Sequence, residues 1–385
     1  MPAPSMSPTR AFRSGFRSGF GSGLRLGASP GARAFSLVEM LVATVILALI
    51  MVLITSFTSQ TGKIWKKSSD KIQAFQGARA AYDEMTSRLS QAVLNPYLDY
   101  YDGTLSLRTP ANATTFIPAT YARNSDLHFI VDRASTLVPD NQADHPGQAV
   151  FFVAPFGYTE TTSTFGGIPS LLNACGYYVE FNTDKPNIPT FLTGLPGIKE
   201  RHRYRLMEFL QPTESLAIYS LPATGQASKY GQWYTNFLPP KTPLSQAPLR
   251  MLAENIIVLI ILPELSPRDA AVTAKVPAAP LAPRYTYDSR AGTINTVAHD
   301  QLPPLLRVAM VAIDETSAQH LAAAAGTAPP GFLEALLQGG GALFQQASQL
   351  DADLASLSDA LIEQHVEYRI FDTDIALRGA RWSTQ

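Results

Sequence analysis

Cysteine is almost absent from this 385-residue chain, which contains Cys175 alone. One thiol cannot form an internal disulfide, and a four-thiolate metal site is excluded, so redox chemistry is not expected.

Basic residues are also scarce outside the N-terminal segment. Five of the 30 lysines and arginines lie in residues 1–34, which hold no acid, so the remainder carries 25 basic against 31 acidic residues. Because nucleic-acid binding usually needs a basic face, no nucleic-acid partner is expected.

Catalytic motifs are missing as well. The sequence contains no HExxH, GxSxG, Walker A or paired CxxC motif. Gly19, Gly21 and Gly23 imitate a dinucleotide-binding loop, but no strand precedes them, and their basic surroundings favour a flexible linker. The six histidines never fall within five residues of one another, so no local metal pair is visible. We therefore expect no catalytic residue, no metal site and no cofactor, and the chain is predicted not to be an enzyme.

Two acidic pairs and one basic stretch are the remaining candidates for a binding site. Asp99 with Asp102, and Asp372 with Asp374, could place carboxylates around calcium, although neither pair supplies the ligand run of an EF-hand loop. Arginines alternate along Arg201–Arg205, so on a strand they would share one face. An acidic partner could dock there, but a solvated sheet face is the preferred interpretation.

The N-terminus contains the strongest signal. Residues 1–34 are rich in Gly, Ser, Arg and Pro and have too little apolar surface to fold alone, which predicts a leader removed on maturation. Next comes Phe35–Thr55, whose 21 residues include the run Met40–Ile54, interrupted only by Thr44. At about 1.5 Å of rise per residue, such a helix reaches roughly 30 Å, the thickness of a bilayer's hydrocarbon core. We expect it to span a membrane once, with the leader on the cytoplasmic side.

Three other interpretations of this apolar segment are a cleaved secretory signal, a plain signal anchor and a buried core helix. Thr55–Ser59 is a poor small-x-small cleavage site, and a core helix does not usually follow an arginine-rich leader. The plain anchor stays open. It gives no reason for Glu39, because a carboxylate inside a membrane costs several kcal/mol unless it has a partner.

The order of residues around Glu39 is specific. Ala34–Glu39 (AFSLVE), followed by an apolar helix, resembles the prepilin-type cleavage and methylation motif of type IV pilins and type II secretion pseudopilins. The resemblance implies that a prepilin peptidase cuts between Ala34, where the family usually has glycine, and Phe35, which becomes the methylated N-terminus. It also implies that Glu39 faces the terminal amine of a neighbouring subunit, where opposite charges offset each other's desolvation.

A long helix is predicted from residue 35 to residue 95, because no proline occurs between Phe35 and Pro96. Beyond the membrane segment, apolar residues recur at helical spacing and form one stripe that should pack on a sheet. We expect the helix to end where Pro96 pushes Asn95 out of helical geometry. The stripe consists of Trp65, Ile72, Phe75, Ala78, Tyr82, Met85, Leu89 and Val93.

Residues 96–385 are predicted to form a β-rich periplasmic body. Seven short segments rich in β-branched and aromatic residues predict an antiparallel sheet. A proline-rich stretch at 263–283 is interpreted as a loop, and an Ala-, Leu- and Gln-rich stretch at 315–364 as a late helical insertion. The predicted fold class is therefore α+β, with the long helix packed on the sheet. The predicted strands are Leu127–Val131, Ala149–Val153, Tyr177–Phe181, Tyr204–Phe209, Ile256–Leu262, Leu306–Ile313 and Tyr368–Phe371.

This order of elements resembles the J-type minor pseudopilins, although the body is larger than theirs. The segments Asn173–Tyr178, Tyr368–Asp374 and Gly379–Ser383 also resemble the pilin-like family called Verru_Chthon cassette protein C. The expected function is a minor pseudopilin of a periplasmic pseudopilus or type IV pilus-like secretion filament.

The expected partners are a prepilin peptidase, other pilin-like subunits and inner-membrane lipid. Before assembly the chain would cross the inner membrane once, with a short cytoplasmic N-terminus and the body in the periplasm. Two alternatives stay open: an adhesin or cargo-binding module carried by a pilin stem and, less favoured, a membrane-tethered enzyme whose pocket is formed by distant segments.

Overall fold

The chain divides into two compact units, residues 1–64 and 65–385, in a computed structural model. The division falls inside the first helix, whereas the sequence suggested a body beginning at residue 96. The predicted leader, including Ala34, and the neighbouring Phe35 lie outside the described residues. The structure describes residues 36–140, 144–160, 166–185, 188–189, 191, 200–219, 232–242, 246–273, 281–292, 294, 296–338 and 342–383.

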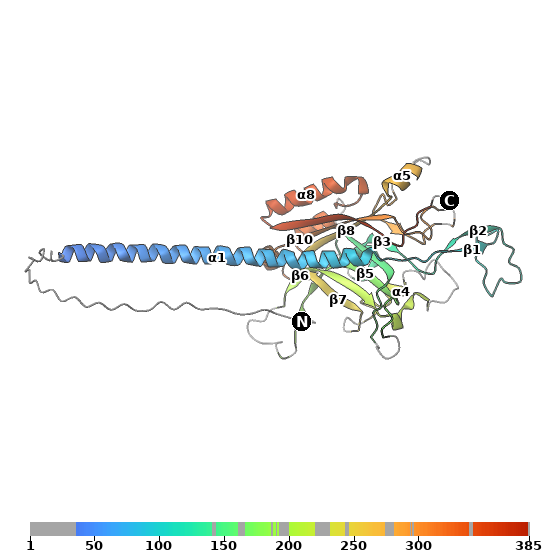
Figure 1. Cartoon of the computed structure of the whole chain (residues 1–385), viewed down its shortest axis with the longest axis horizontal. Coiled ribbons are helices and arrows are strands. Elements are labelled where there is room, and N and C mark those ends of the chain that lie inside the picture. Colours follow the sequence, from blue (N-terminus) through green and yellow to red (C-terminus); the bar gives the residue numbers. More distant parts are fainter. Residues whose placement is uncertain are drawn as a thin grey trace, which may run out of the picture. The chain divides into compact units, whose positions relative to one another are not determined.

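Helix α1 (Leu37–Leu89) contains both the apolar segment and the amphipathic stripe (Figure 1). Its stripe is buried at Ala78, Tyr82, Met85 and Leu89, as the spacing predicts. The prediction is wrong at Trp65, which is 75% exposed.

The helix also ends earlier than predicted. After Leu89 the chain turns into an extended course, and Val93 N donates a hydrogen bond of 2.9 Å to Val153 O in strand β4 (Gln148–Pro155). The bond to β4 competes with continued helix, so the helix stops well before Asn95, whose φ of 46° is left-handed.

The body contains a six-stranded antiparallel sheet, a three-stranded antiparallel sheet and a separate two-stranded hairpin (Figure 1). The large sheet has the order β7-β6-β5-β4-β3-β9, and the small sheet the order β11-β10-β8. Each predicted strand overlaps an observed one, and the α+β class is confirmed, although the strands form two main sheets and not one. The remaining strands are β1 (Tyr97–Tyr101), β2 (Thr120–Asn124), β3 (Ile130–Arg133), β5 (Leu172–Thr183), β6 (His202–Gln211), β7 (Leu249–Glu254), β8 (Ile256–Glu264), β9 (Tyr287–Asp288), β10 (Leu305–Ile313) and β11 (Tyr368–Ala376).

The large sheet buries both of its faces. In β5, Cys175, Tyr177 and Val179 belong to one hydrophobic core, while Ala174 and Tyr178 belong to another. This alternation follows from the period of two along a strand. The first core is shared with α1 and the small sheet, and the second is closed by α2 (Ala134–Leu137) and α4 (Gln232–Thr235).

The small sheet lies between two helices. On one face, the hydroxyl of Tyr82 in α1 donates a hydrogen bond of 2.6 Å to Val308 O in β10, and its ring lies 5.6 Å from that of Phe371 in β11. On the other face, Arg307 of β10 bonds to Asp351 of α8 (Leu350–Glu363) at 2.7 Å. The apolar side of α8 joins the same core as the small sheet, as the arrangement in Figure 1 suggests.

The late helical insertion forms α6 (Glu315–Ala325), α7 (Gly331–Leu337) and α8, with a short 3-10 turn at Ala347–Gln349. Asp314 caps α6 by accepting a bond of 2.9 Å from Ser317 N. Residues 339–341 of this insertion lie outside the described residues.

The proline-rich stretch differs from the expected loop. Residues 267–273 form helix α5 (Pro267–Thr273). Pro267 occupies the first helical position, where its missing N–H removes no helical bond, and Ser266 caps the helix by accepting a bond of 3.1 Å from Asp269 N. Residues 274–280 lie outside the described residues. Two further 3-10 turns occur at Thr213–Ser215 and Ala217–Tyr219.

Candidate assembly site

The candidate assembly site lies at the beginning of α1. Met40 N donates a bond of 3.1 Å to Ser36 O, which closes the first helical turn and places Glu39 within it. A carboxylate at this end of a helix is favoured by the helix dipole, by about 0.3–1 kcal/mol at an exposed site. Ala34 and Phe35 lie outside the described residues, so their roles in cleavage and methylation stay predictions.

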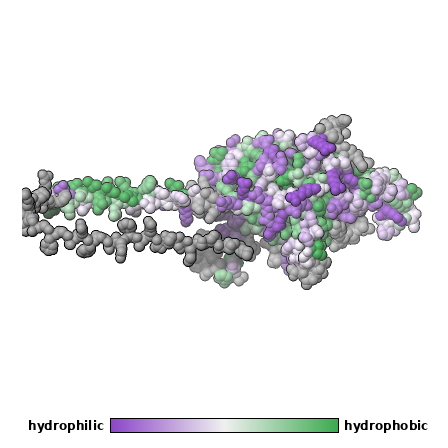
Figure 2. Space-filling model, in the orientation of Figure 1, coloured by the Kyte–Doolittle hydropathy of each residue, from purple (hydrophilic) through white to green (hydrophobic). Residues whose placement is uncertain are grey.

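The helix that follows is apolar and exposed on all sides. Leu37–Lys66 has the length and composition of a membrane span, with a mean hydropathy of 2.9 in its most apolar part, none of which is buried. Leu37 is 81% and Val52 is 68% exposed, and apolar side chains extend along the segment in Figure 2. An all-round apolar helix without a protein partner is unstable in water. The segment fits a single-pass membrane anchor.

Several hydroxyl groups of this segment form hydrogen bonds with the backbone of their own helix. Thr44 Oγ1 donates to Leu41 O at 2.9 Å, and Thr55 Oγ1 donates to Met51 O at 2.8 Å. Thr58 forms the same kind of bond. Because every unpaired polar group is costly in hydrocarbon, these local bonds make the polar residues compatible with a bilayer.

Glu39 is the exception. It is the only ionisable side chain between Leu37 and Gly62, and it is exposed on the surface of α1. A carboxylate in a membrane is stable only with a partner, so this position calls for a cation supplied by another molecule or another chain.

The comparison with protein families bears on this segment. Residues 30–55 match the prokaryotic N-terminal methylation motif. The match includes Ala34, Phe35 and Glu39 and supports a place in the type IV pilin-like superfamily, whose members are processed by a prepilin peptidase. No curated protein and no solved structure matches the chain.

A second cluster of charged residues joins the C-terminal part of α1 to the large sheet. Glu208 of β6 is fully buried, and its carboxylate accepts bonds from Arg88 at 2.8 Å, from Tyr177 at 2.7 Å and from Arg250. Glu84 of α1 bonds to Arg88 at 2.9 Å and to Arg250 at 2.7 Å. We name Glu84, Arg88, Tyr177, Glu208 and Arg250 the stem cluster.

The stem cluster compensates a buried charge. A lone buried carboxylate is costly, but Glu208 has two cationic partners and a hydroxyl donor. Burial also raises the pKa of the Tyr177 phenol, which therefore stays a donor at neutral pH. Glu208 was not predicted from the sequence, although it resembles Glu39 in being the one carboxylate within an apolar stretch, here Leu206–Leu210.

One carboxylate of each acidic pair considered for calcium is bound within the chain. Asp102 accepts hydrogen bonds from Thr104 and Ser106, and these bonds lower its pKa. Asp372 pairs with Arg307 at 2.7 Å. Within the part of the chain that the structure describes, no group of three or more His, Cys, Asp or Glu side chains could hold a metal ion.

The expectation of a solvated arginine face holds for Arg201, whose side chain is 54% exposed, but it is wrong for the two arginines within β6. Arg203 is 4% and Arg205 is 2% exposed. Arg203 pairs with Glu315 at the start of α6 at 3.0 Å, and Arg205 pairs with Glu254 in β7 at 3.2 Å. The two side chains are buried because acids from neighbouring elements cover them, and the sequence of β6 alone does not reveal those partners.

Proposed function

We propose that this chain is a minor pseudopilin-like subunit of a periplasmic pseudopilus or a type IV pilus-like secretion filament. A prepilin peptidase removes the leader between Ala34 and Phe35 and methylates Phe35. The subunit then waits in the inner membrane, with its body in the periplasm, and enters the filament through α1. The large, irregular body favours a minor component, as in the J-type pseudopilins. No catalytic step is assigned to it.

The observation that carries this proposal is the position of Glu39. It lies within the methylation motif and in the first turn of an exposed apolar helix, and no other ionisable side chain shares that helix before Lys63. A methylated terminal amine at Phe35 of a neighbouring subunit is a cation at the right depth in the membrane. Pairing with that amine would offset the desolvation of Glu39 and fix the axial register of the subunits.

Filament entry of the Glu39→Ala variant tests this proposal. We expect the variant to stay in the membrane fraction after alkaline extraction, because the apolar helix is unchanged, but to be lost from sheared filaments. Thr44→Ala is the matched control, since the Thr44 hydroxyl bonds only to its own helix and its removal should leave filament entry intact. Entry of Glu39→Ala at the level of the unmodified chain would contradict the proposal.

A second candidate function is an adhesin or cargo-binding module on a pilin stem. The β1–β2 hairpin favours it, because Tyr100 and Tyr121 are each 54% exposed and lie opposite each other with ring centroids 4.8 Å apart. Exposed aromatic pairs are common in contact surfaces. Under this candidate, replacing both tyrosines with alanine abolishes capture of cargo and leaves filament entry unchanged.

A further inference from the structure

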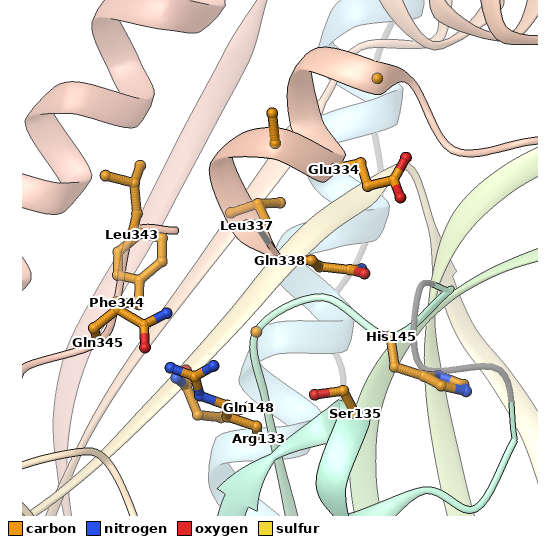
Figure 3. Close-up of a pocket in the computed structure, with 13 residues that line it drawn as sticks. Arg133, Ser135, His145, Gln148, Glu334, Leu337, Gln338, Leu343, Phe344 and Gln345 are labelled. Carbon is orange, nitrogen blue, oxygen red and sulfur yellow. The ribbon is translucent and has the colours of Figure 1, made fainter. Parts of the chain in front are cut away.

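A cavity in the body carries an inference beyond filament assembly. Its volume is about 580 Å³, and it lies between the β3–β4 corner and helix α7. Figure 3 shows Arg133, Ser135 and Gln148 on one side, with Glu334 and Gln338 of α7 on the other. Pockets of roughly 300–1,000 Å³ are the usual size for small-molecule sites.

Some polar side-chain atoms in the wall of this cavity have no hydrogen-bond partner within the protein. Gln148 is 1% and His145 is 2% exposed. The Gln148 Oε1 and the Gln338 Nε2 have no hydrogen-bond partner. Both belong to residues that line the cavity. Since buried polar groups are normally hydrogen-bonded, an unpaired acceptor and an unpaired donor in the lining of one cavity favour polar contents.

The charges of the cavity cancel. Within the described residues, neither the Arg133 guanidinium nor the Glu334 carboxylate forms a hydrogen bond or ion pair, so both are available to a ligand. Burial lowers the pKa of His145 to about 4, and its imidazole is therefore neutral near pH 7. An anion would suit Arg133 but face Glu334, and a cation would have the reverse difficulty.

We propose that this cavity binds a small neutral polyhydroxylated molecule, a mono- or disaccharide. A hydroxyl group both donates and accepts, so neighbouring hydroxyls of one sugar can serve the Gln148 acceptor, the Gln338 donor and both charged groups without bringing a net charge. The terminal torsion of a glutamine side chain is broad, so each amide can turn toward the cavity. Leu337, Leu343 and Phe344 add an apolar wall for the C–H face of a sugar ring.

Saturation-transfer NMR on the full-length protein in detergent tests this proposal. The probes are glucose, galactose, mannose, N-acetylglucosamine and its disaccharide, with glycine and acetate as charged comparisons. We expect at least one saccharide to receive saturation at millimolar concentration, and neither charged probe to do so. Saturation of none of the sugars, or stronger saturation of glycine or acetate, would overturn the proposal.

Gln148→Met separates this site from binding elsewhere on the surface. The substitution keeps the side-chain volume and removes the unserved acceptor, so we expect thermal unfolding at the same or a higher temperature and saccharide binding weakened about tenfold. Gln364→Met, at an exposed position outside the cavity, should leave binding unchanged. If Gln148→Met does not fold, Glu334→Ala on the exposed side of α7 replaces it. Saccharide binding that is insensitive to the folded variant would also overturn the proposal.

Discussion

The guanidinium of Arg88 in α1 donates a hydrogen bond of 2.8 Å to the buried carboxylate of Glu208 in β6. Strand register explains why the other partners are within reach, because Glu208 lies directly opposite Tyr177 of β5 and Arg250 of β7. The pair therefore joins the pilin-like helix to three neighbouring strands of the large sheet. Its role is structural, because it fixes the position of the helix against the sheet.

Removal of the Arg88 charge should destabilise the body. Arg88→Met keeps the unbranched apolar part of the side chain but removes the guanidinium, which leaves Glu208 with Arg250 and Tyr177 alone. Since complete loss of partners for a buried charge costs about 3–5 kcal/mol, we expect a smaller loss of about 1–3 kcal/mol in the free energy of unfolding. Denaturant unfolding of the detergent-solubilised chain measures it.

The control for this prediction is Arg79→Met on the same helix. Arg79 pairs with Asp83 at 3.6 Å, but the two side chains are 67% and 61% exposed. An exposed pair of this kind contributes below about 0.5 kcal/mol. Equal losses for the two variants would show that the stem cluster has no special role.

Gly176→Ala should destabilise the large sheet. Gly176 of β5 lies opposite Phe151 of β4, and a Cβ atom added there would approach the Phe151 ring to 2.3 Å and Val150 O to 2.9 Å. Forcing a methyl group into a packed core costs about 1–3 kcal/mol, so the midpoint of thermal unfolding should fall. Gly103→Ala is the matched control, because nothing lies within 4 Å of its added Cβ. Thermal circular dichroism compares the two, and an unchanged midpoint for Gly176→Ala would contradict the packing described for β4 and β5.

The carboxyl group of Glu180 should make the free energy of unfolding decrease as the pH rises. Burial raises the pKa of this carboxyl from its ordinary 4.5 to about 7, and Asp140 and Asp144 act in the same direction. Between these two values the folded state holds a proton that the unfolded state has released, so the free energy of unfolding decreases from about pH 4.5 to pH 7. Relative to the unmodified chain, Glu180→Gln should gain about 1–3 kcal/mol at pH 8 and little at pH 4. A difference between the two proteins that does not change with pH would refute this assignment.

Periodicity predicted the buried part of α1 well. Tyr82, Met85 and Leu89 recur at helical spacing, and the same property places them against the sheets. Local sequence could not predict where the helix ends, because the Val93 bond to Val153 depends on a strand far along the chain. The same reason explains β7 and β9, whose short or partly polar sequences become strands only beside an existing sheet edge.

The candidate site was predictable in part for a related reason. Glu39 stands out because its neighbours in sequence are all apolar, and the anomaly is local. The stem cluster consists of residues from α1, β5, β6 and β7. The roles of Arg88 and Arg250 could not be predicted from the sequence, because strand register and helix packing bring them to Glu208. Likewise, Arg203 and Arg205 look like surface residues until Glu315 and Glu254 are placed beside them.

The N-terminal mass of the mature protein, expressed with and without an active prepilin peptidase, tests the central claim most directly. A peptide beginning at methylated Phe35 in the presence of the peptidase, and an intact leader in its absence, is the predicted result. An intact leader under both conditions, or a terminus near Ser59, would contradict the pilin-like account and identify an ordinary anchored or secreted protein.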